Sequence, residues 1–269
     1  MQLSLAISPC PNDTFIFDAL VNNKIDTKGF SFDLHLADVE ELNQSAFNNQ
    51  FDITKLSYHA LSNCLGNYDL LDAGSALGRN CGPLLISRLP YEKNDLIGKI
   101  IAIPGEWTTA NFLLTYFDIP KIEIKEYLFS DIEAAIKTGQ VDAGVIIHEN
   151  RFTYADRGFR LVQDLGAYWE LKSGYPIPLG GIAIKKNLDQ EVKQSVNSLI
   201  FESLQYAMST RGELPPFVLS NAQEMEETVM RKHIDLYVNK FSLSLGEEGF
   251  AAIIELFSAL KSPPPTLIK

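Results

Sequence analysis

The chain has 269 residues, of which 46% are hydrophobic and 21% are charged. This composition is typical of a globular, soluble protein, and the apolar runs are shorter than the ~20 residues that a membrane-spanning helix needs. Asp and Glu number 34 against 23 Lys and Arg, so the net charge of −11 argues against nucleic acid and anionic membranes as partners. An anionic ligand would have to be bound by local dipoles.

The cysteines favour a reducing environment. Cys10, Cys64 and Cys81 are odd in number and have no Cys-x-x-Cys spacing, which disfavours a disulfide framework and a zinc site. The first lysine is Lys24, after the first predicted helix, so a basic leader of an export signal is missing. We therefore expect a cytoplasmic protein, and the composition leaves its oligomeric state open.

Short apolar strands and helices alternate in the first third of the chain. Their βαβαβα order predicts an α/β sheet, followed by two further strands. The predicted elements are helices beginning near Thr14, Val39 and Tyr58, and strands at residues 3–7, 30–36, 51–56, 70–73 and 83–87.

A second α/β unit follows a polar connector at residues 89–95. Its predicted elements are strands at 100–103, 122–127 and 141–147 and helices at 110–117 and 131–138. The remainder is mostly helical, and Asn221 and Glu224 have the spacing of a helix cap.

This order predicts two lobes, the first formed by residues 1–88 and 182–269 and the second by residues 89–181. Two crossings marked by Gly and Pro, near residues 88–95 and 174–181, would join them. Paired crossings of this kind suggest a hinge-closing cleft that binds a ligand.

Three loops connect the carboxyl end of a predicted strand to a helix, at residues 8–14, 55–58 and 105–110. Ligands of open α/β sheets bind at such ends. Lys55 closes one strand, and the helix N-termini could bind a carboxylate without further charge. The alternative is that these residues only cap their helices. The polar residues concerned are Asn12, Asp13, Ser57, Thr108 and Thr109.

His148 is the strongest candidate for chemistry. It ends the apolar run at 141–147, which has the pattern of a buried parallel strand. An imidazole there would face the cleft and could act as a general base, because the ordinary pKa of histidine is close to neutral. The alternative is a structural histidine at a strand end. His35, His59 and His233 are expected to be structural, and no two histidines have metal-ligand spacing.

Other chemistries have little support. The sequence contains no Gly-x-Ser-x-Gly elbow, Walker loop or dinucleotide fingerprint, so we expect neither a cofactor nor a metal. Four aromatic residues near the loops could stack on a flat ligand or pack in the core: Trp107, Phe152, Tyr154 and Trp169.

At these loops the chain resembles the 1,4-dihydroxy-6-naphthoate synthase family, which acts in menaquinone synthesis by the futalosine route. The resemblance spans the chain, and one departure is Asn150, where the family pattern has a glycine. The similar stretches are residues 8–15, Lys55-Leu56-Ser57, Pro104-Gly105 with Thr108-Thr109-Ala110, and Ile147-His148-Glu149 with Arg151-Phe152-Thr153-Tyr154.

The resemblance implies a two-lobed fold like that of type II periplasmic binding proteins. It implies a carbon–carbon lyase that converts cyclic dehypoxanthine futalosine, an aromatic carboxylate, to 1,4-dihydroxy-6-naphthoate and dihydroxyacetone, without a cofactor. It gives the role of proton acceptor to His148. The implied substrate contacts are Lys55, Leu56, Ser57, Thr109 and Ala110.

Two other functions remain open at this point. Chorismate dehydratase, a relative in the same pathway with the same kind of fold, would remove water from a smaller substrate. A solute-binding or sensor protein would bind a small anion without turnover. Product analysis with purified substrates separates the three.

Overall fold

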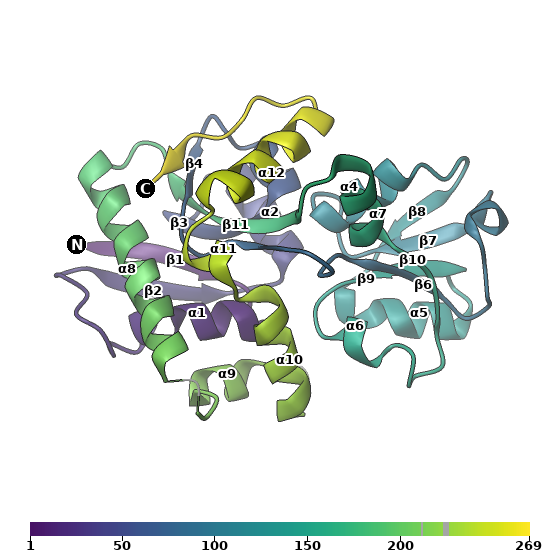
Figure 1. Ribbon diagram of the computed structural model, residues 1–269, viewed down its shortest axis with the longest axis horizontal. Coiled ribbons are helices and arrows are strands. Elements are labelled where there is room, and N and C mark those ends of the chain that lie inside the picture. The colour runs from purple at the N-terminus through teal and green to yellow at the C-terminus, as the bar shows by residue number, and fades with distance from the viewer. Residues whose placement is uncertain (211, 223–225) are drawn as a thin grey trace. The chain divides into compact units, whose positions relative to one another are not determined.

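A computed structural model describes residues 1–210, 212–222 and 226–269 of the protein. The chain divides into two compact units, which are labelled by element in Figure 1. Unit 1 consists of Met1–Gly78 and Pro178–Lys269, and unit 2 of Arg79–Ile177. The predicted helix cap of Asn221 and Glu224 includes a residue that lies outside the described ones.

The sheet of unit 1 brings two of the predicted ligand loops to one edge. Its strand order is β12-β4-β11-β3-β1-β2, and β5 pairs with β11. Because β1 is parallel to both β2 and β3, the carboxyl ends of these strands lie at the same edge. The strands are β1 (Gln2–Ile7), β2 (Ser31–Leu36), β3 (Ile53–Ser57), β4 (Tyr68–Leu71), β5 (Ala76–Gly78), β11 (Ile177–Lys185) and β12 (Leu267–Ile268).

Helices surround this sheet and bury its apolar side chains. Helix α1 packs against α8, and Ser203 bridges them, since its hydroxyl donates to the Ile16 carbonyl at 2.6 Å and accepts from the Leu20 amide at 3.1 Å. Leu5 and Ile7 of β1 and Val196 of α8 belong to one hydrophobic core with residues of α1. The helices are α1 (Pro11–Val21), α2 (Val39–Phe47), α3 (Tyr58–Ser62), α8 (Gln190–Ser209), α9 (Pro216–Asn221), α10 (Glu227–Tyr237), α11 (Lys240–Leu243) and α12 (Gly246–Ala259).

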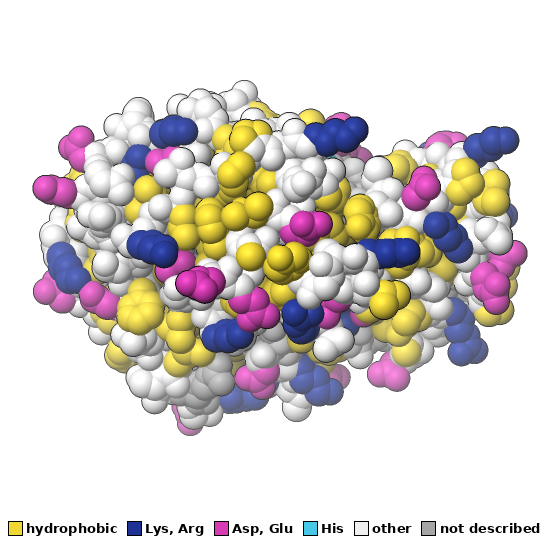
Figure 2. Space-filling view, turned by 45° about the horizontal axis from the view of Figure 1, so that its top comes forward, with side chains coloured by type: hydrophobic (Ala, Val, Ile, Leu, Met, Phe, Trp, Pro, Cys, Tyr) yellow, Lys and Arg dark blue, Asp and Glu magenta, His cyan; other side chains and the backbone are white. Residues whose placement is uncertain are grey.

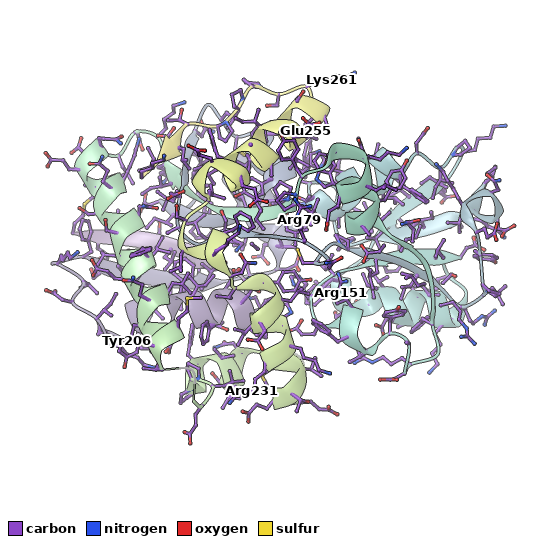
Figure 3. All side chains as sticks on the ribbon, in the orientation of Figure 1. Arg79, Arg151, Tyr206, Arg231, Glu255 and Lys261 are labelled. Carbon is purple, nitrogen blue, oxygen red and sulfur yellow. The ribbon has the colours of Figure 1, made fainter. Side chains whose placement is uncertain are left out.

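Unit 2 is built on a second sheet with the order β10-β6-β9-β7-β8. Strand β9 runs parallel to β7 and antiparallel to β6. The elements are β6 (Leu84–Ser87), β7 (Ile100–Ile103), α4 (Thr109–Phe117), β8 (Glu123–Glu126), α5 (Ile132–Thr138), β9 (Ala143–Ile146), α6 (Asn150–Thr153), β10 (Arg160–Asp164) and α7 (Leu165–Ser173), with 3-10 turns at Lys93–Leu96 and Phe129–Asp131. Figure 3 labels Arg151, which lies on α6.

The boundary between the units differs from the predicted one. The strand at 83–87, assigned from sequence to the first lobe, is β6 in the sheet of unit 2, where Leu84 pairs with Ile146 and Asp164. Its partners follow far along the chain, so local periodicity could not reveal the pairing. Strand β10 and helix α7, which also belong to unit 2, were not predicted from the sequence.

The surface agrees with the composition. On the face shown in Figure 2, acidic and basic side chains are interspersed with hydrophobic ones. None of the described helices is both long and apolar enough to cross a membrane.

Candidate functional site

The loop after β1 leads directly into α1. Cys10 occupies the N-cap, with φ −64° and ψ 148°, and Pro11 is the first helical residue. Proline is favoured at this position, because its fixed φ suits a helix and because the first helical residue needs no N–H donor. The prediction that Asn12 or Asp13 caps α1 is therefore wrong. Both lie in the first turn, and both are buried.

Asp13 is the centre of a buried polar cluster, the Asp13 network, formed by Ser8, Asn12, Asp13, Lys55 and His233. The Lys55 ammonium lies 2.7 Å from Asp13 Oδ1, and the two side chains are only 7% and 1% exposed. The Asn12 amide donates to the same oxygen at 2.8 Å, and the Ser8 hydroxyl donates to Oδ2 at 2.7 Å. The carboxylate therefore already balances the positive charge of Lys55.

His233 extends the network from helix α10. Its Nε2 lies 2.9 Å from Asn12 Oδ1. Because the Asn12 amide nitrogen donates to Asp13, its oxygen must accept, so His233 Nε2 is the donor. A structural role was expected for His233 from the sequence, but its contact with Asn12 was not. The two residues are 221 positions apart, and their spacing gives no signal of it.

The loop after β3 differs from expectation in its cap. Ser57 occupies the N-cap position of α3, but its side chain bonds elsewhere. The Asn43 amide donates to Ser57 Oγ at 3.2 Å, and Ser57 N donates to Asn43 Oδ1 at 3.0 Å. Leu56 is fully buried. Asn43 is thus a neighbour of the candidate site that the sequence did not indicate.

In unit 2 the predicted cap of α4 is confirmed. The Thr108 hydroxyl accepts from the Asn111 amide at 3.2 Å. The helix begins at Thr109, one residue before the predicted start, so Thr109 and Ala110 form its first turn. Both are buried, at 2% and 3% exposure. This turn presents backbone N–H groups at the positive end of the helix dipole.

His148 lies in a strained turn after β9. The strand ends at Ile146, earlier than predicted, and His148 has φ +59°. Such a backbone is uncommon for a residue other than glycine, and strain of this kind is concentrated at functional sites. The imidazole is half-buried, and the ring of Phe129 meets it edge-to-face, with centroids 4.6 Å apart.

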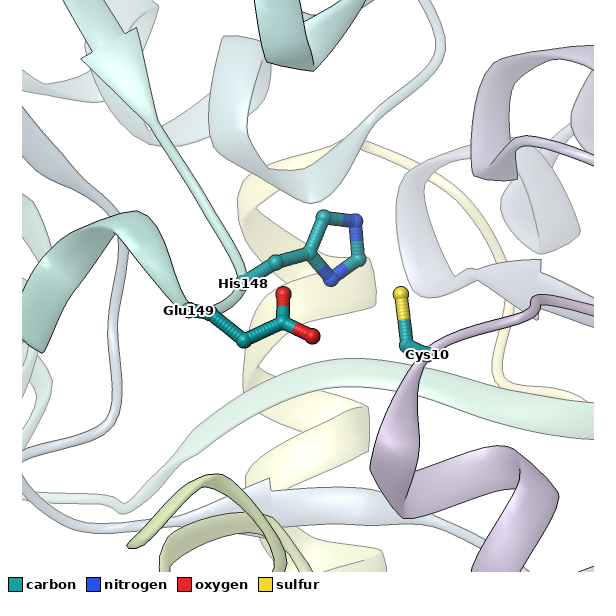
Figure 4. Close-up of side chains that lie close together, drawn as sticks. All are labelled: Cys10, His148 and Glu149. Atoms are coloured by element: carbon teal, nitrogen blue, oxygen red, sulfur yellow. The ribbon is translucent and has the colours of Figure 1, made fainter. Parts of the chain in front are cut away.

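Glu149 brings a buried carboxylate to the same turn. It is 4% exposed, and its oxygen lies within 4.8 Å of a His148 ring nitrogen. Figure 4 shows both side chains at the start of α6. A negative charge so close stabilises an imidazolium, which is the form that a base takes after accepting a proton. This turn therefore has the components of a general base.

Two cysteines and one of the candidate stacking residues are explained by burial in the core. Burial raises the pKa of the Cys81 thiol to about 12 and that of Cys64 to about 11, so both are poor nucleophiles near neutral pH. Trp169 is fully buried against Phe112 and Tyr116, so it is a core residue. Neither unit by itself brings three of its described His, Cys, Asp or Glu side chains together as a metal site requires.

The remaining aromatic candidates are half-buried, and His35 is exposed. Trp107, Phe152 and Tyr154 are half-buried, and Tyr154 packs against the core of unit 2. His35 is exposed on β2 and stacks on Phe51, with ring centroids 5.0 Å apart, in agreement with its expected structural role.

Sequence comparison relates the chain to enzymes. A family described as menaquinone biosynthesis has a sequence model that matches residues 3–262. The protein named 1,4-dihydroxy-6-naphtoate synthase from Thermus thermophilus is 39% identical over 273 residues, which cover 99% of this chain and 99% of that protein. The similarity therefore extends over both units.

Structural comparison identifies the fold. A protein from Archaeoglobus fulgidus with a crystal structure has a TM-score of 0.91 and 31% identity, and the match covers 97% of each chain. The periplasmic aliphatic sulphonate binding protein SsuA of Escherichia coli has a TM-score of 0.67 and 13% identity, covering 97% of this chain and 86% of that one. The predicted α/β fold of the periplasmic-binding-protein type is confirmed.

Proposed function

The chain belongs to the menaquinone biosynthesis family, and on this basis we propose that it is a 1,4-dihydroxy-6-naphthoate synthase. It is an enzyme of menaquinone biosynthesis. The proposed reaction is that of a carbon–carbon lyase, which converts cyclic dehypoxanthine futalosine to 1,4-dihydroxy-6-naphthoate and dihydroxyacetone. The reaction would need no cofactor, because one base and the aromatic system of the substrate suffice for it.

His148 is the proposed base. Neutral imidazole accepts a proton from the substrate, a carbon–carbon bond breaks, and the departing aromatic enolate or phenolate takes up the electrons released. The observation that supports this role is the half-buried imidazole at φ +59°, with Phe129 on its edge and the Glu149 carboxylate nearby. The imidazolium returns its proton to solvent or product before the next turnover.

The proposed substrate contacts are the site residues predicted from the sequence. Unit 1 supplies Asn12, Asp13, Lys55, Leu56 and Ser57. Because Asp13 already balances Lys55, we propose that the substrate carboxylate is bound chiefly by neutral donors, including the first turn of α4. The proposed contacts there are the N-cap residue Thr108 and the first-turn residues Thr109 and Ala110.

Product analysis tests the function. The purified protein is incubated with cyclic dehypoxanthine futalosine, without added cofactor and with EDTA, and the naphthoate and dihydroxyacetone are measured by mass spectrometry. Both should form together. Product from chorismate instead would favour a dehydratase, and tight binding of either compound without turnover would favour a binding protein.

His148→Asn tests the role of the base. The variant should keep its circular dichroism spectrum and lose about 10²–10⁴-fold in kcat, which is the usual contribution of one acid–base group. His35→Asn is the matched control, because His35 is an exposed residue on β2. If folded His148→Asn retains kcat within about threefold, His148 is not the base.

A further inference from the structure

The strained turn at His148 needs an anchor on its carboxyl side. On the amino side, β9 is hydrogen-bonded to both β6 and β7. On the other side, α6 is a single short turn whose four residues are all half-buried. A left-handed backbone is unfavourable for a residue with a side chain, so surrounding contacts must stabilise it. Apolar burial of α6 provides little of this.

Arg151 on α6 makes the polar contacts that fix this segment. One terminal nitrogen, Nη1, donates to the carbonyl of Gly82. The other, Nη2, donates to Asp164 Oδ2 at 3.4 Å. The Arg151 side chain is 14% exposed and that of Asp164 is 22% exposed, so water screens the pair less than it screens a surface pair.

Both acceptors are held in place by their own surroundings. Gly82 lies against Gly166 so closely that a Cβ at position 82 would be 2.2 Å from the Gly166 Cα. Asp164 caps α7, because its Oδ1 accepts from the Ala167 amide at 2.9 Å. Arg151 therefore connects α6 to two fixed points in unit 2.

These contacts close a loop through the sheet. Gly82 lies just before β6, and Asp164 is the last residue of β10, while β6 pairs with both β10 and β9. After β9 the chain turns at His148 and enters α6, where Arg151 donates to Gly82 and Asp164 beside the strands β6 and β10. The turn is thus fixed at both ends.

We propose that Arg151 is a positioning residue that holds the His148 imidazole in its reactive place. The inference rests on the proposed function of His148 as a base. An arginine suits the task because its planar fork donates to two acceptors at once, whereas a lysine presents a single point charge. A small displacement of a base costs much of its effect, up to about 10²-fold for 1 Å.

Kinetics of Arg151→Gln and Arg151→Lys test the role. Both variants should lower kcat by about tenfold or more with KM within about threefold, and Lys should retain more activity than Gln. Arg157→Gln is the matched control, since Arg157 forms an ion pair with Glu133 at 3.0 Å in the same unit and is 44% exposed. Its kcat should stay within about twofold of the parent.

A double-mutant cycle shows whether the effect passes through His148. In the His148→Asn background, Arg151→Gln should lower kcat by no more than about twofold further, because the base that Arg151 positions is already missing. A full additional tenfold loss, or a rise in KM alone, would mean that Arg151 acts independently of His148 and would overturn the proposal.

NMR of the histidine rings gives an answer that does not depend on activity. The His148 signals are assigned by their loss in His148→Asn, and they should shift in Arg151→Gln but not in Arg157→Gln. If His148→Asn proves active, His148 is not the base, and the ring signals still show whether Arg151 positions the His148 imidazole. Unchanged signals together with unchanged kcat in Arg151→Gln would overturn the inference.

If Arg151→Gln does not fold, Asp164→Asn provides a second test of the positioning role. Asparagine can still cap α7 but lacks the charge that attracts Arg151. It should therefore shift the His148 signals and lower kcat in the same direction, by less than the arginine variants. An Asp164→Asn protein with parental signals and parental kcat would contradict the role of this contact.

Discussion

The buried pair of Lys55 and Asp13 makes a sharp prediction about stability. In Asp13→Asn the side chain keeps its shape but loses its charge. The Lys55 side chain, 7% exposed, would then remain buried, and its ammonium would still donate to the carbonyl of Gly74 at 3.4 Å. The Ser8 and Asn12 donors would also lose a charged acceptor.

The expected loss is large because one partner of a buried ion pair is left uncompensated. Such changes cost about 3–5 kcal/mol in the free energy of unfolding. The surface pair of Lys28 and Glu202 gives the comparison, since its atoms are 2.6 Å apart but its side chains are 48% and 39% exposed. Breaking an exposed pair of this kind costs about 0–1 kcal/mol.

Urea unfolding followed by circular dichroism measures both losses. Asp13→Asn should be less stable than Glu202→Gln by several kcal/mol. The double variant Asp13→Asn/Lys55→Met should recover part of the loss, because it removes the uncompensated charge. If Asp13→Asn costs no more than about 1 kcal/mol, the Asp13 network is not a dry ion pair and the reasoning fails.

Two further predictions concern packing and pH. Gly144→Ala on β9 would place a Cβ 2.5 Å from Cγ2 of the buried Ile132, so the free energy of unfolding in urea should fall by about 1–3 kcal/mol. Gly66→Ala is the control, because no described atom beyond the adjacent residues lies within 4 Å of the new Cβ, and it should change stability by less than about 0.5 kcal/mol. Equal effects of the two variants would contradict this. Burial alone raises the pKa of Asp52, but hydrogen bonds from Ser4 and Lys185 lower it overall. A carboxyl with a lowered folded-state pKa stabilises the fold above its unfolded pKa of about 4 and ceases to do so as the pH falls through the folded value. The stability difference between parent and Asp52→Asn should therefore shrink below about pH 4, and a difference constant down to pH 2 would count against it.

Local patterns in the sequence predicted the features that depend on neighbouring residues. The Thr108 cap, the strand before His148 and the loops at carboxyl strand ends all follow from residues a few positions apart. Features that depend on distant residues were missed. His233 forms a hydrogen bond with Asn12, 221 positions away. Asn43 donates to the hydroxyl of Ser57, which was expected to cap α3 instead.

Lys55 shows how a spatial neighbour changes the physical role that a residue's place in the sequence suggests. In the sequence, a lysine at a strand end beside a helix start indicates a cation for an anionic ligand. The structure adds Asp13, which lies next to it in space, and the two charges cancel. Sequence spacing could not show this, because Asp13 lies on α1 and Lys55 on β3, and the parallel pairing of β1 with β3 brings these two elements together.

The fold leaves the choice between binding and catalysis to particular side chains, because one architecture supports both. A binding protein needs only donors that match the ligand in its ground state. A catalyst needs a group whose interaction becomes stronger in the transition state. In the proposed function, backbone N–H groups at the start of α4 would hold the carboxylate equally in both states, so their loss should raise KM and leave kcat nearly unchanged. As the proposed base, neutral imidazole at position 148 would gain a proton only as the substrate reacts, so its loss should lower kcat and leave KM nearly unchanged. The same criterion distinguishes Arg151 from Thr109. Substitution of a residue that positions the base should change kcat, and substitution of a residue that binds the carboxylate should change KM.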